Sequence, residues 1–196
     1  MATSNDSRRP EPCGAALDRP AWVTELEHRI EGELDCSPLA RRLYAQDASI
    51  YEQQPLGVVR PRSAEDCAAI VRAAVASGFS VIPRGGGTSL AGQCVGEGLV
   101  IEFTRYMNRV LELDPERRCA WVEPGLVQDD LNDAAAPHGL MFAPDTSTSR
   151  QAAIGGMIGN NSCGAFSVRF GTTREHVESL HVTLADGSPA TLGPLD

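Results

Sequence analysis

The sequence of 196 residues contains six cysteines but no Cys-x-x-Cys pair and no compact group of cysteines. Zinc and iron–sulfur sites need thiolates at short, regular spacings, so this scatter argues against such a site within the chain. Cys67 falls on the apolar face of a predicted helix and Cys119 in a strand pattern. We therefore predict buried free thiols at these two positions and no metal site.

The chain also lacks a long apolar run and an excess of basic residues. No segment approaches the roughly 18 apolar residues of a membrane span. The chain has 17 basic and 26 acidic residues, which gives a formal net charge of −9. This charge argues against nucleic acid or an anionic membrane surface as the main partner. A phosphorylated ligand must then be held by backbone N–H groups and a few local arginines.

Export signals are missing as well. Residues 1–20 are polar and proline-rich, and their Arg8-Arg9 pair is followed by no apolar run. Neither a secretory signal peptide nor a twin-arginine signal is supported. We predict a disordered N-terminus over residues 1–20 and a soluble protein of a reducing compartment, the cytoplasm.

The best-marked element is a helix between Ser63 and Gly78. Ser63 can cap its first turn, Asp66 completes a capping-box pattern, and Gly78 supplies the stop. Short apolar strands flank this helix at 57–61 and 80–82, which predicts a βαβ unit with a ligand loop after its second strand. The apolar positions of the helix recur with its period and are Cys67, Ile70, Val71, Ala74 and Val75.

The remaining pattern predicts helices near the N-terminus and strands farther along. Residues 21–54 are expected to hold N-terminal helices, one over 21–32 and a short one after Ser37-Pro38. The later elements are strands at 99–103, 110–113, 119–122 and 177–184, with a helix at 126–136.

A glycine-rich loop follows the strand at 80–82. Six glycines lie between Gly85 and Gly98. Glycine lets backbone N–H groups approach a ligand with no Cβ in the way, and successive N–H groups can form a nest for a pyrophosphate. The loop has no lysine, which excludes a P-loop, and it lacks the G-x-G-x-x-G spacing of a Rossmann site. Two interpretations stay open: a nest for a phosphate-bearing cofactor, and a flexible surface loop.

A second segment, residues 143–164, is rich in serine, threonine, glycine and asparagine. Its paired glycines permit close approach to a flat or extended ligand, and its amides and hydroxyls offer neutral hydrogen-bonding groups. Taken alone, the segment could equally be a helix-packing element with small residues. Together with the first loop it suits a long, two-ended ligand such as a dinucleotide, which needs more than one contact segment.

The two segments and their flanks resemble a known family. The motifs are Ile82-Pro83-Arg84-Gly85-Gly86-Gly87-Thr88-Ser89-Leu90-Ala91-Gly92-Gln93, Pro144-Asp145, Ile154-Gly155-Gly156, and His176-Val177 followed by Leu184-Ala185-Asp186-Gly187. In this order they are similar to the FAD-binding domain of FAD-linked oxidases of the p-cresol methylhydroxylase/vanillyl-alcohol oxidase type. Within that family the chain resembles the glycolate oxidase, D-lactate dehydrogenase and D-2-hydroxyglutarate dehydrogenase branch.

The resemblance implies an FAD site. The first loop would hold the pyrophosphate through Arg84, Gly85, Gly86, Gly87, Thr88, Ser89, Leu90 and Gln93. The second would lie along the flavin and ribityl chain with Pro144, Asp145, Thr148, Gly155, Gly156, Asn161 and Gly164. Thr88 and Ser89 stand where relatives with covalent flavin often carry histidine, which implies non-covalent FAD. Ala153 replaces a threonine common in the family, so one hydroxyl contact is missing.

The expected fold is α+β and two-lobed, a small βαβ lobe followed by a larger mixed or antiparallel lobe, with the FAD-binding domain over 55–196. The implied activity is oxidation of a 2-hydroxy acid by hydride transfer to FAD; the alternative is a truncated, non-catalytic FAD-binding fragment. No residue matches the family's catalytic groups; His138 is interpreted as a solvated residue at a helix end and His176 as a structural residue before a strand. Residues 160–164 resemble large bacterial enzymes with an iron–sulfur half, so the expected partners are a 2-hydroxy acid and an iron–sulfur protein or missing C-terminal half.

Overall fold

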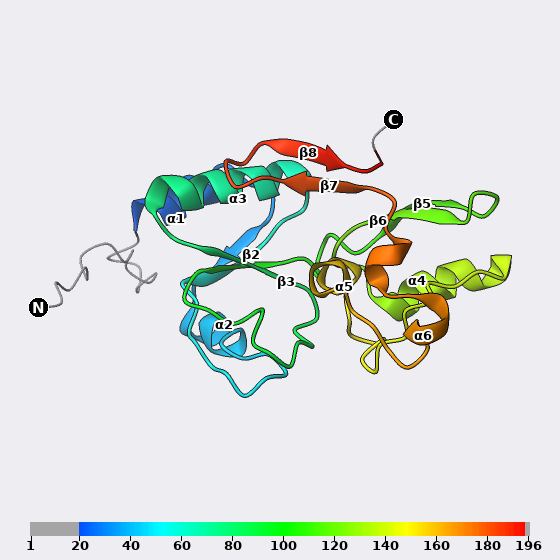
Figure 1. Cartoon of the computed structure of the whole chain (residues 1–196). Coiled ribbons are helices and arrows are strands. Elements are labelled where there is room, and N and C mark those ends of the chain that lie inside the picture. The colour runs from blue at the N-terminus through cyan, green and yellow to red at the C-terminus, as the bar shows by residue number, and fades with distance from the viewer. Residues whose placement is uncertain (1–19, 195–196) are drawn as a thin grey trace, which may run out of the picture.

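The computed structural model describes residues 20–194, and the predicted disorder of residues 1–20 lies outside this range except for Pro20. The first lobe is built on a four-stranded sheet of order β1-β2-β4-β3 (Figure 1). Strand β1 pairs antiparallel with β2, whereas β2 and β3 both pair parallel with β4. The strands are β1 (Glu33–Asp35), β2 (Gly57–Arg60), β3 (Val81–Arg84) and β4 (Leu99–Glu102).

Helices cover both faces of this sheet because successive strand residues point to opposite sides. Val59 and Ile101 belong to the core cluster that includes α1 (Ala21–Glu27) and α3 (Ala64–Ser77). Their neighbours Val58 and Val100 pack instead with Ala40 of α2 (Pro38–Leu43). The two central strands are therefore buried on both faces, which explains their continuous apolar sequences.

Helix α3 confirms the predicted start and stop and corrects two details. The Ser63 hydroxyl accepts a hydrogen bond from the Asp66 N–H at 3.1 Å, and Gly78 ends the helix in the left-handed region at φ 72°. The Asp66 carboxylate does not complete a capping box, because it accepts instead from the N–H groups of Glu31, Gly32 and Arg62. Val75, predicted on the buried face, is 64% exposed.

The strands β2 and β3 are parallel, as a βαβ unit requires, but they are not neighbours. Strand β4 lies between them and pairs with both. The segment predicted to hold only helices, residues 21–54, also contributes β1, and the helix expected over 21–32 ends at Glu27. The N-terminal segment is thus part of the first lobe, although the proposed boundaries at residues 20 and 54 stay predictions.

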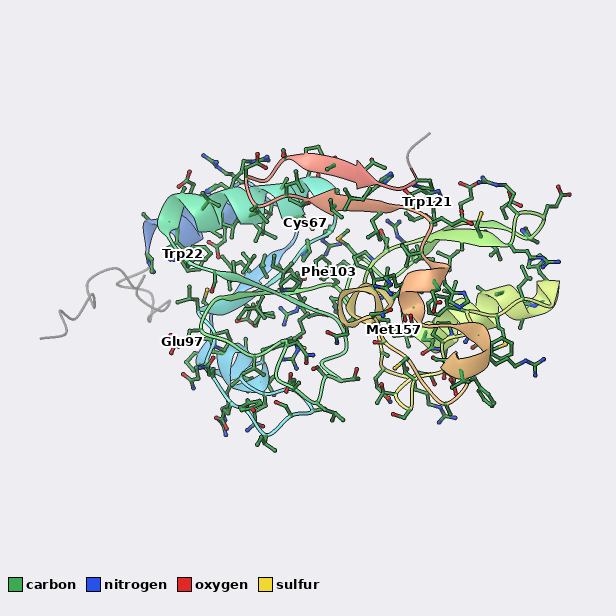
Figure 2. The ribbon with its side chains drawn as sticks, viewed as in Figure 1. Trp22, Cys67, Glu97, Phe103, Trp121 and Met157 are labelled. Carbon is green, nitrogen blue, oxygen red and sulfur yellow. The ribbon has the colours of Figure 1, made fainter. Side chains whose placement is uncertain are left out.

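The second lobe combines a hairpin with short helices. Its core joins the hairpin β5–β6 to α4 and α5 through Leu126, Leu131, Ile154 and Met157, the last labelled in Figure 2. The predicted strands at 110–113 and 119–122 are confirmed, the first extending to Asp114. The elements are β5 (Val110–Asp114), β6 (Cys119–Val122), α4 (Gln128–Ala135), η1 (Ala136–His138), α5 (Ile154–Asn160), α6 (Ser167–Phe170) and η2 (Thr173–His176).

A second hairpin connects the two lobes. It consists of β7 (Leu180–Thr183) and β8 (Pro189–Leu192), and it runs along α3 in Figure 1. Arg72 of α3 donates a hydrogen bond to the carbonyl of Gly187 in its turn at 2.8 Å. In the second lobe Trp121 of β6 stacks on His181 of β7, with ring centroids 4.6 Å apart (Figure 2).

The structure confirms the predicted α+β, two-lobed fold and departs from it in one important place. Residues 154–160, interpreted as part of a low-bulk loop or a packing element, form the helix α5. The strand predicted at 177–184 is shorter and β8 was not predicted. No helix among residues 20–194 is long and apolar enough to cross a membrane.

Candidate FAD site

The first glycine loop leaves β3 and packs directly against the second segment. A Cβ on Gly86 would lie 1.9 Å from the carbonyl oxygen of Gln151, and one on Gly85 would lie 2.7 Å from the Cβ of Ala153. Neither backbone carbonyl nor buried methyl can give way at such distances. These two glycines are therefore needed for contact between the loops, and the structure brings the two predicted segments together.

Arg84 and Gly87 shape the loop from within. Gly87 adopts φ 66°, and a Cβ there would lie 2.5 Å from Nη2 of Arg84. The Arg84 guanidinium lies 5.1 Å from the centre of the Tyr44 ring and donates weak hydrogen bonds to the carbonyls of Tyr44 and Cys94, at 3.4 and 3.5 Å. The arginine side chain thus fastens the start of the loop to its far end and to α2.

The backbone of the loop keeps donors available. Within residues 20–194, no group accepts a hydrogen bond from the N–H of Gly85, Gly86, Gly87 or Thr88. The Gly87 carbonyl, in contrast, accepts from the Ala48 N–H at 3.0 Å. Successive unpaired N–H groups on a fixed backbone are what an anion nest requires. The loop therefore fits a pyrophosphate bound by main chain.

The far end of the loop is more exposed. Leu90 is 80% exposed, Gln93 is exposed, and the Ser89 hydroxyl accepts a hydrogen bond from the Ala91 N–H at 3.3 Å. A cavity of about 300 Å³ lies beside this end, and none of its lining residues belongs to the second segment. Its lining is Tyr51, Glu52, Gln53, Ala91, Gly92 and Val95. Among residues 20–194, neither Leu90 nor Gln93 makes a hydrogen bond to the second segment.

Cys94 lies on the inner side of this loop beside Asp47. Burial raises the pKa of the Cys94 thiol, and nearby Asp47 adds to this effect while Arg84 opposes it. The thiol is thus neutral near pH 7. Burial likewise raises the pKa of Cys67, to about 11. Cys67 and Cys119 are both partly buried, and no cysteine within residues 20–194 forms a disulfide.

The second segment is anchored to the start of α4 by reciprocal backbone hydrogen bonds. The N–H groups of Ile154 and Gly155, at the start of α5, donate to the carbonyls of Leu126 and Pro124, both at 2.8 Å. In return the Gln128 N–H donates to the Ala152 carbonyl at 3.0 Å. A Cβ on Gly155 would lie 2.7 Å from the Cβ of Pro124. Neither helix has a side-chain N-cap, so each helix start depends on the other segment.

The side chain of Gln128 continues this anchoring and was not predicted from the sequence. It is 2% exposed, donates to the carbonyl of Pro144 and accepts from the Thr146 hydroxyl at 2.8 Å. Nothing in the local sequence distinguishes Gln128 from a solvated glutamine in the first turn of a helix. Its burial follows only from the way the segment 143–153 folds over α4.

Two polar residues predicted to face the cofactor make contacts within the protein. Asp145 accepts a hydrogen bond from the Phe166 N–H at 2.9 Å, and Asn161, at φ 48°, accepts one from the Arg174 N–H at 2.9 Å. A Cβ on Gly164 would lie 1.5 Å from the Asp145 carbonyl oxygen. These contacts close the segment on itself and fix its shape.

One face of α5 is open. A Cβ built on Gly156 or Gly159 meets no atom within 4 Å, and both residues are exposed. A flat ring could therefore approach the α5 backbone at these positions, beside the point where Gly85 contacts Ala153. Of the predicted residues, Gly156 lies on this open face, whereas Pro144 is buried and its carbonyl accepts a hydrogen bond from Gln128.

The histidines within residues 20–194 lie away from the two segments or make structural contacts. His28 bonds the Thr24 carbonyl at 2.6 Å, and His176 bonds the Phe170 carbonyl at 2.7 Å. His138 is exposed at the end of η1, and His181 stacks on Trp121. In the same range no group of three or more His, Cys, Asp or Glu is arranged to hold a metal ion.

Comparison with known proteins identifies the family. A family model described as an FAD binding domain matches residues 55–193, and this chain belongs to that family. FAD is thus the cofactor of its family, and the two anchored segments lie within the matched range.

Relatives share this part of the chain at moderate identity. A D-2-hydroxyglutarate dehydrogenase of Pseudomonas putida is 39% identical over 170 residues, covering 85% of this chain and 17% of that protein. The glycolate oxidase subunit GlcD of Bacillus subtilis is 36% identical over 155 residues, covering 78% of this chain and 33% of that protein. The chain therefore spans a minor part of the length of both relatives.

A solved structure supports the fold at lower identity. An alkyldihydroxyacetonephosphate synthase superposes with a TM-score of 0.78 and 22% identity, covering 96% of this chain and 36% of that one.

Proposed function

We propose that this chain binds FAD non-covalently between the first glycine loop and the second segment. The observation that carries the proposal is the row of unpaired N–H groups from Gly85 to Thr88, held where the loop packs on residues 151–153. The formal charge of −9 makes a general attraction for phosphate weak, so a local main-chain nest is the suitable device. Thr88 and Ser89 occupy the positions in the first loop where a histidine could attach the flavin covalently, so we propose non-covalent binding.

Each segment then has its own role. The pyrophosphate would lie at Arg84–Leu90 with Gln93 nearby, where the backbone donates and the Arg84 side chain supports the loop from behind. The flavin and ribityl chain would lie along the second segment, against the open face at Gly156, with Thr148 close in sequence and Gly155, Asn161 and Gly164 holding the backbone. When bound, FAD supplies the two-electron redox chemistry that hydride removal from a 2-hydroxy acid requires.

We further propose that the chain is the flavin-binding part of a 2-hydroxy-acid dehydrogenase or oxidase of the D-lactate, glycolate or D-2-hydroxyglutarate class. The names of the two relatives support this substrate class. Because the chain spans only 17% of the first relative, further protein would supply the substrate site, either as a C-terminal half or as an iron–sulfur partner. The proposed location is the cytoplasm.

Reconstitution with FAD tests the proposal. The purified chain should retain FAD through gel filtration, show the flavin absorbance bands, and release all flavin on acid precipitation, since no covalent bond is formed. The control is Thr88→Val, which removes a hydroxyl but leaves the backbone donors and should weaken binding only slightly. A chain that retains no flavin at any FAD concentration would refute the proposal.

A second candidate is an FAD-binding unit without turnover. It is favoured by the histidines of residues 20–194, because His28, His176 and His181 are engaged in structural contacts. The FAD-loaded chain should be tested on D-lactate, D-2-hydroxyglutarate and glycolate with a dye acceptor. Turnover would rule out this candidate, whereas flavin binding without turnover would support it.

A further inference from the structure

Gln128 is a buried polar side chain of α4 that lies outside the two segments of the proposed FAD site but contacts the second one. It is 2% exposed, and its amide donates to the Pro144 carbonyl while its oxygen accepts from the Thr146 hydroxyl. A buried amide is destabilising unless both its ends are paired. Here both ends are paired, and both partners belong to one short stretch of the second segment.

The main chain of the same residue holds the other end of that stretch. The Gln128 N–H donates to the Ala152 carbonyl at 3.0 Å, next to Ala153, which contacts Gly85 of the first loop. The next residue, Asp129, donates its N–H to the Ser149 carbonyl at 3.2 Å. Gln128 therefore joins the beginning and the end of an irregular stretch that has no regular secondary structure of its own.

We propose that Gln128 is a positioning residue for the flavin: it fixes residues 144–152 and, through Ala153, the place where the two FAD-binding segments meet. This inference rests on the proposed FAD site. An apolar side chain of similar volume would fill the same space but leave the Pro144 carbonyl and the Thr146 hydroxyl without their partner, so the stretch would lose its fixed conformation while the core stayed filled.

The test compares Gln128→Met with Thr146→Val and with Ser63→Ala. Gln128→Met removes both side-chain hydrogen bonds, and Thr146→Val removes one of them. Ser63→Ala removes the N-cap of α3 in the first lobe and serves as a stability control. The dissociation constant for FAD is measured by flavin fluorescence, and the visible circular dichroism of the bound flavin is recorded at saturating FAD.

Gln128→Met should weaken FAD binding about tenfold, the equilibrium effect of one buried hydrogen-bonding group left unpaired. It should also change the circular dichroism of the bound flavin, because the ring sits in an altered environment. Thr146→Val should produce a smaller change of the same kind. Ser63→Ala should lower the melting temperature and leave both flavin measurements unchanged.

The outcomes separate the two proposals. If the wild-type chain binds FAD and Gln128→Met binds it with the same affinity and the same circular dichroism, the positioning role is wrong and the FAD site stands. A wild-type chain that binds no FAD overturns the site itself, and the role of Gln128 with it. Should Gln128→Met fail to fold, Thr146→Val decides, and wild-type flavin behaviour in that variant would overturn the role.

Discussion

The two segments of the candidate FAD site use glycine in opposite ways. In the first loop the space beside Gly85, Gly86 and Gly87 is filled by protein atoms, and the backbone N–H groups are left free. On α5 the space beside Gly156 is empty, and the N–H groups of Ile154 and Gly155 are engaged in the anchor. The first loop offers hydrogen-bond donors from a backbone that packs tightly against residues 151–153, and α5 offers an open surface at Gly156.

This difference matches the two ends of the ligand. A pyrophosphate needs convergent donors, which a tightly packed loop can hold at fixed positions. An aromatic ring needs a flat surface without side chains, which an open glycine on a fixed helix provides. A glycine-rich sequence alone does not distinguish these uses, because only the neighbours show which glycines face protein and which face the ligand.

A pair of glycine-to-alanine substitutions should separate the two uses most strongly. Gly86→Ala forces a methyl group against the Gln151 carbonyl and should lower the free energy of unfolding by about 3 kcal/mol. Gly156→Ala meets no protein atom and should raise it by about 0.5 kcal/mol, while weakening FAD binding. Chemical denaturation and flavin titration measure the two effects. Equal stability losses in both variants would contradict the comparison.

A substitution in α3 tests whether FAD affinity depends only on the overall free energy of unfolding. Asp66 lies away from both segments and accepts hydrogen bonds from three backbone N–H groups, those of Glu31, Gly32 and Arg62. Asp66→Asn loses acceptors and should lower the free energy of unfolding by about 2 kcal/mol. Its FAD affinity should equal that of the wild type below the melting transition. A parallel loss of affinity would show that the whole first lobe, and not the loop, determines binding.

The smallest expected effect concerns pH and the anchor of the second segment. Burial alone would raise the pKa of the Glu123 carboxyl group. Hydrogen bonds from the side chain and the backbone N–H of Arg109 outweigh this effect, so the pKa of Glu123 lies below its ordinary value of 4.5. A pKa lowered by folding contributes stability above 4.5 that is lost as pH falls through the depressed value. Glu123 immediately precedes Pro124, whose carbonyl accepts a hydrogen bond from the Gly155 N–H at the start of α5. Protonation of Glu123 in acid should therefore also weaken the anchor of α5.

Glu123→Gln should therefore lower the melting temperature by about 2 °C at pH 7, and the difference from the wild type should vanish in acid. Thermal melts between pH 3 and pH 7 measure it. Ser63→Ala, which lowers stability without removing a carboxylate, is the control and should differ from the wild type by a similar amount at every pH. A constant difference at every pH would show that the Glu123 carboxylate does not titrate as inferred.

The parts of the fold that the sequence predicted are those whose signals are local. Ser63 and Gly78 bound α3 because a hydroxyl cap and a left-handed stop depend on the adjacent backbone alone. The strands β5 and β6 follow from apolar runs on both sides of a turn at residues 114–117. The family motifs led to the FAD assignment that the family match supports.

The parts that were missed depend on distant partners. Ile154-Gly155-Gly156 has poor helix propensity, yet α5 forms because carbonyls of Leu126 and Pro124 accept its first N–H groups. Strand β1 exists through pairing with β2, and Gln128 is buried through the fold of residues 143–153. Val75 has the right helical spacing, but only Ile70 and Ala74 among the predicted apolar positions are fully buried. None of these contacts is encoded within a short window of sequence.

The hairpin β7–β8 has a consequence for the proposed FAD site, because it contacts both lobes. Its turn is held by Arg72 of the first lobe, and its strand β7 is held by Trp121 of the second. A ligand that contacts both lobes stabilises the arrangement of the lobes in which Arg72 and Trp121 both contact the hairpin. FAD binding at the proposed site and docking of the hairpin would therefore be thermodynamically linked. By reciprocity, detaching the hairpin should weaken FAD binding at the proposed site, and fastening it should strengthen that binding.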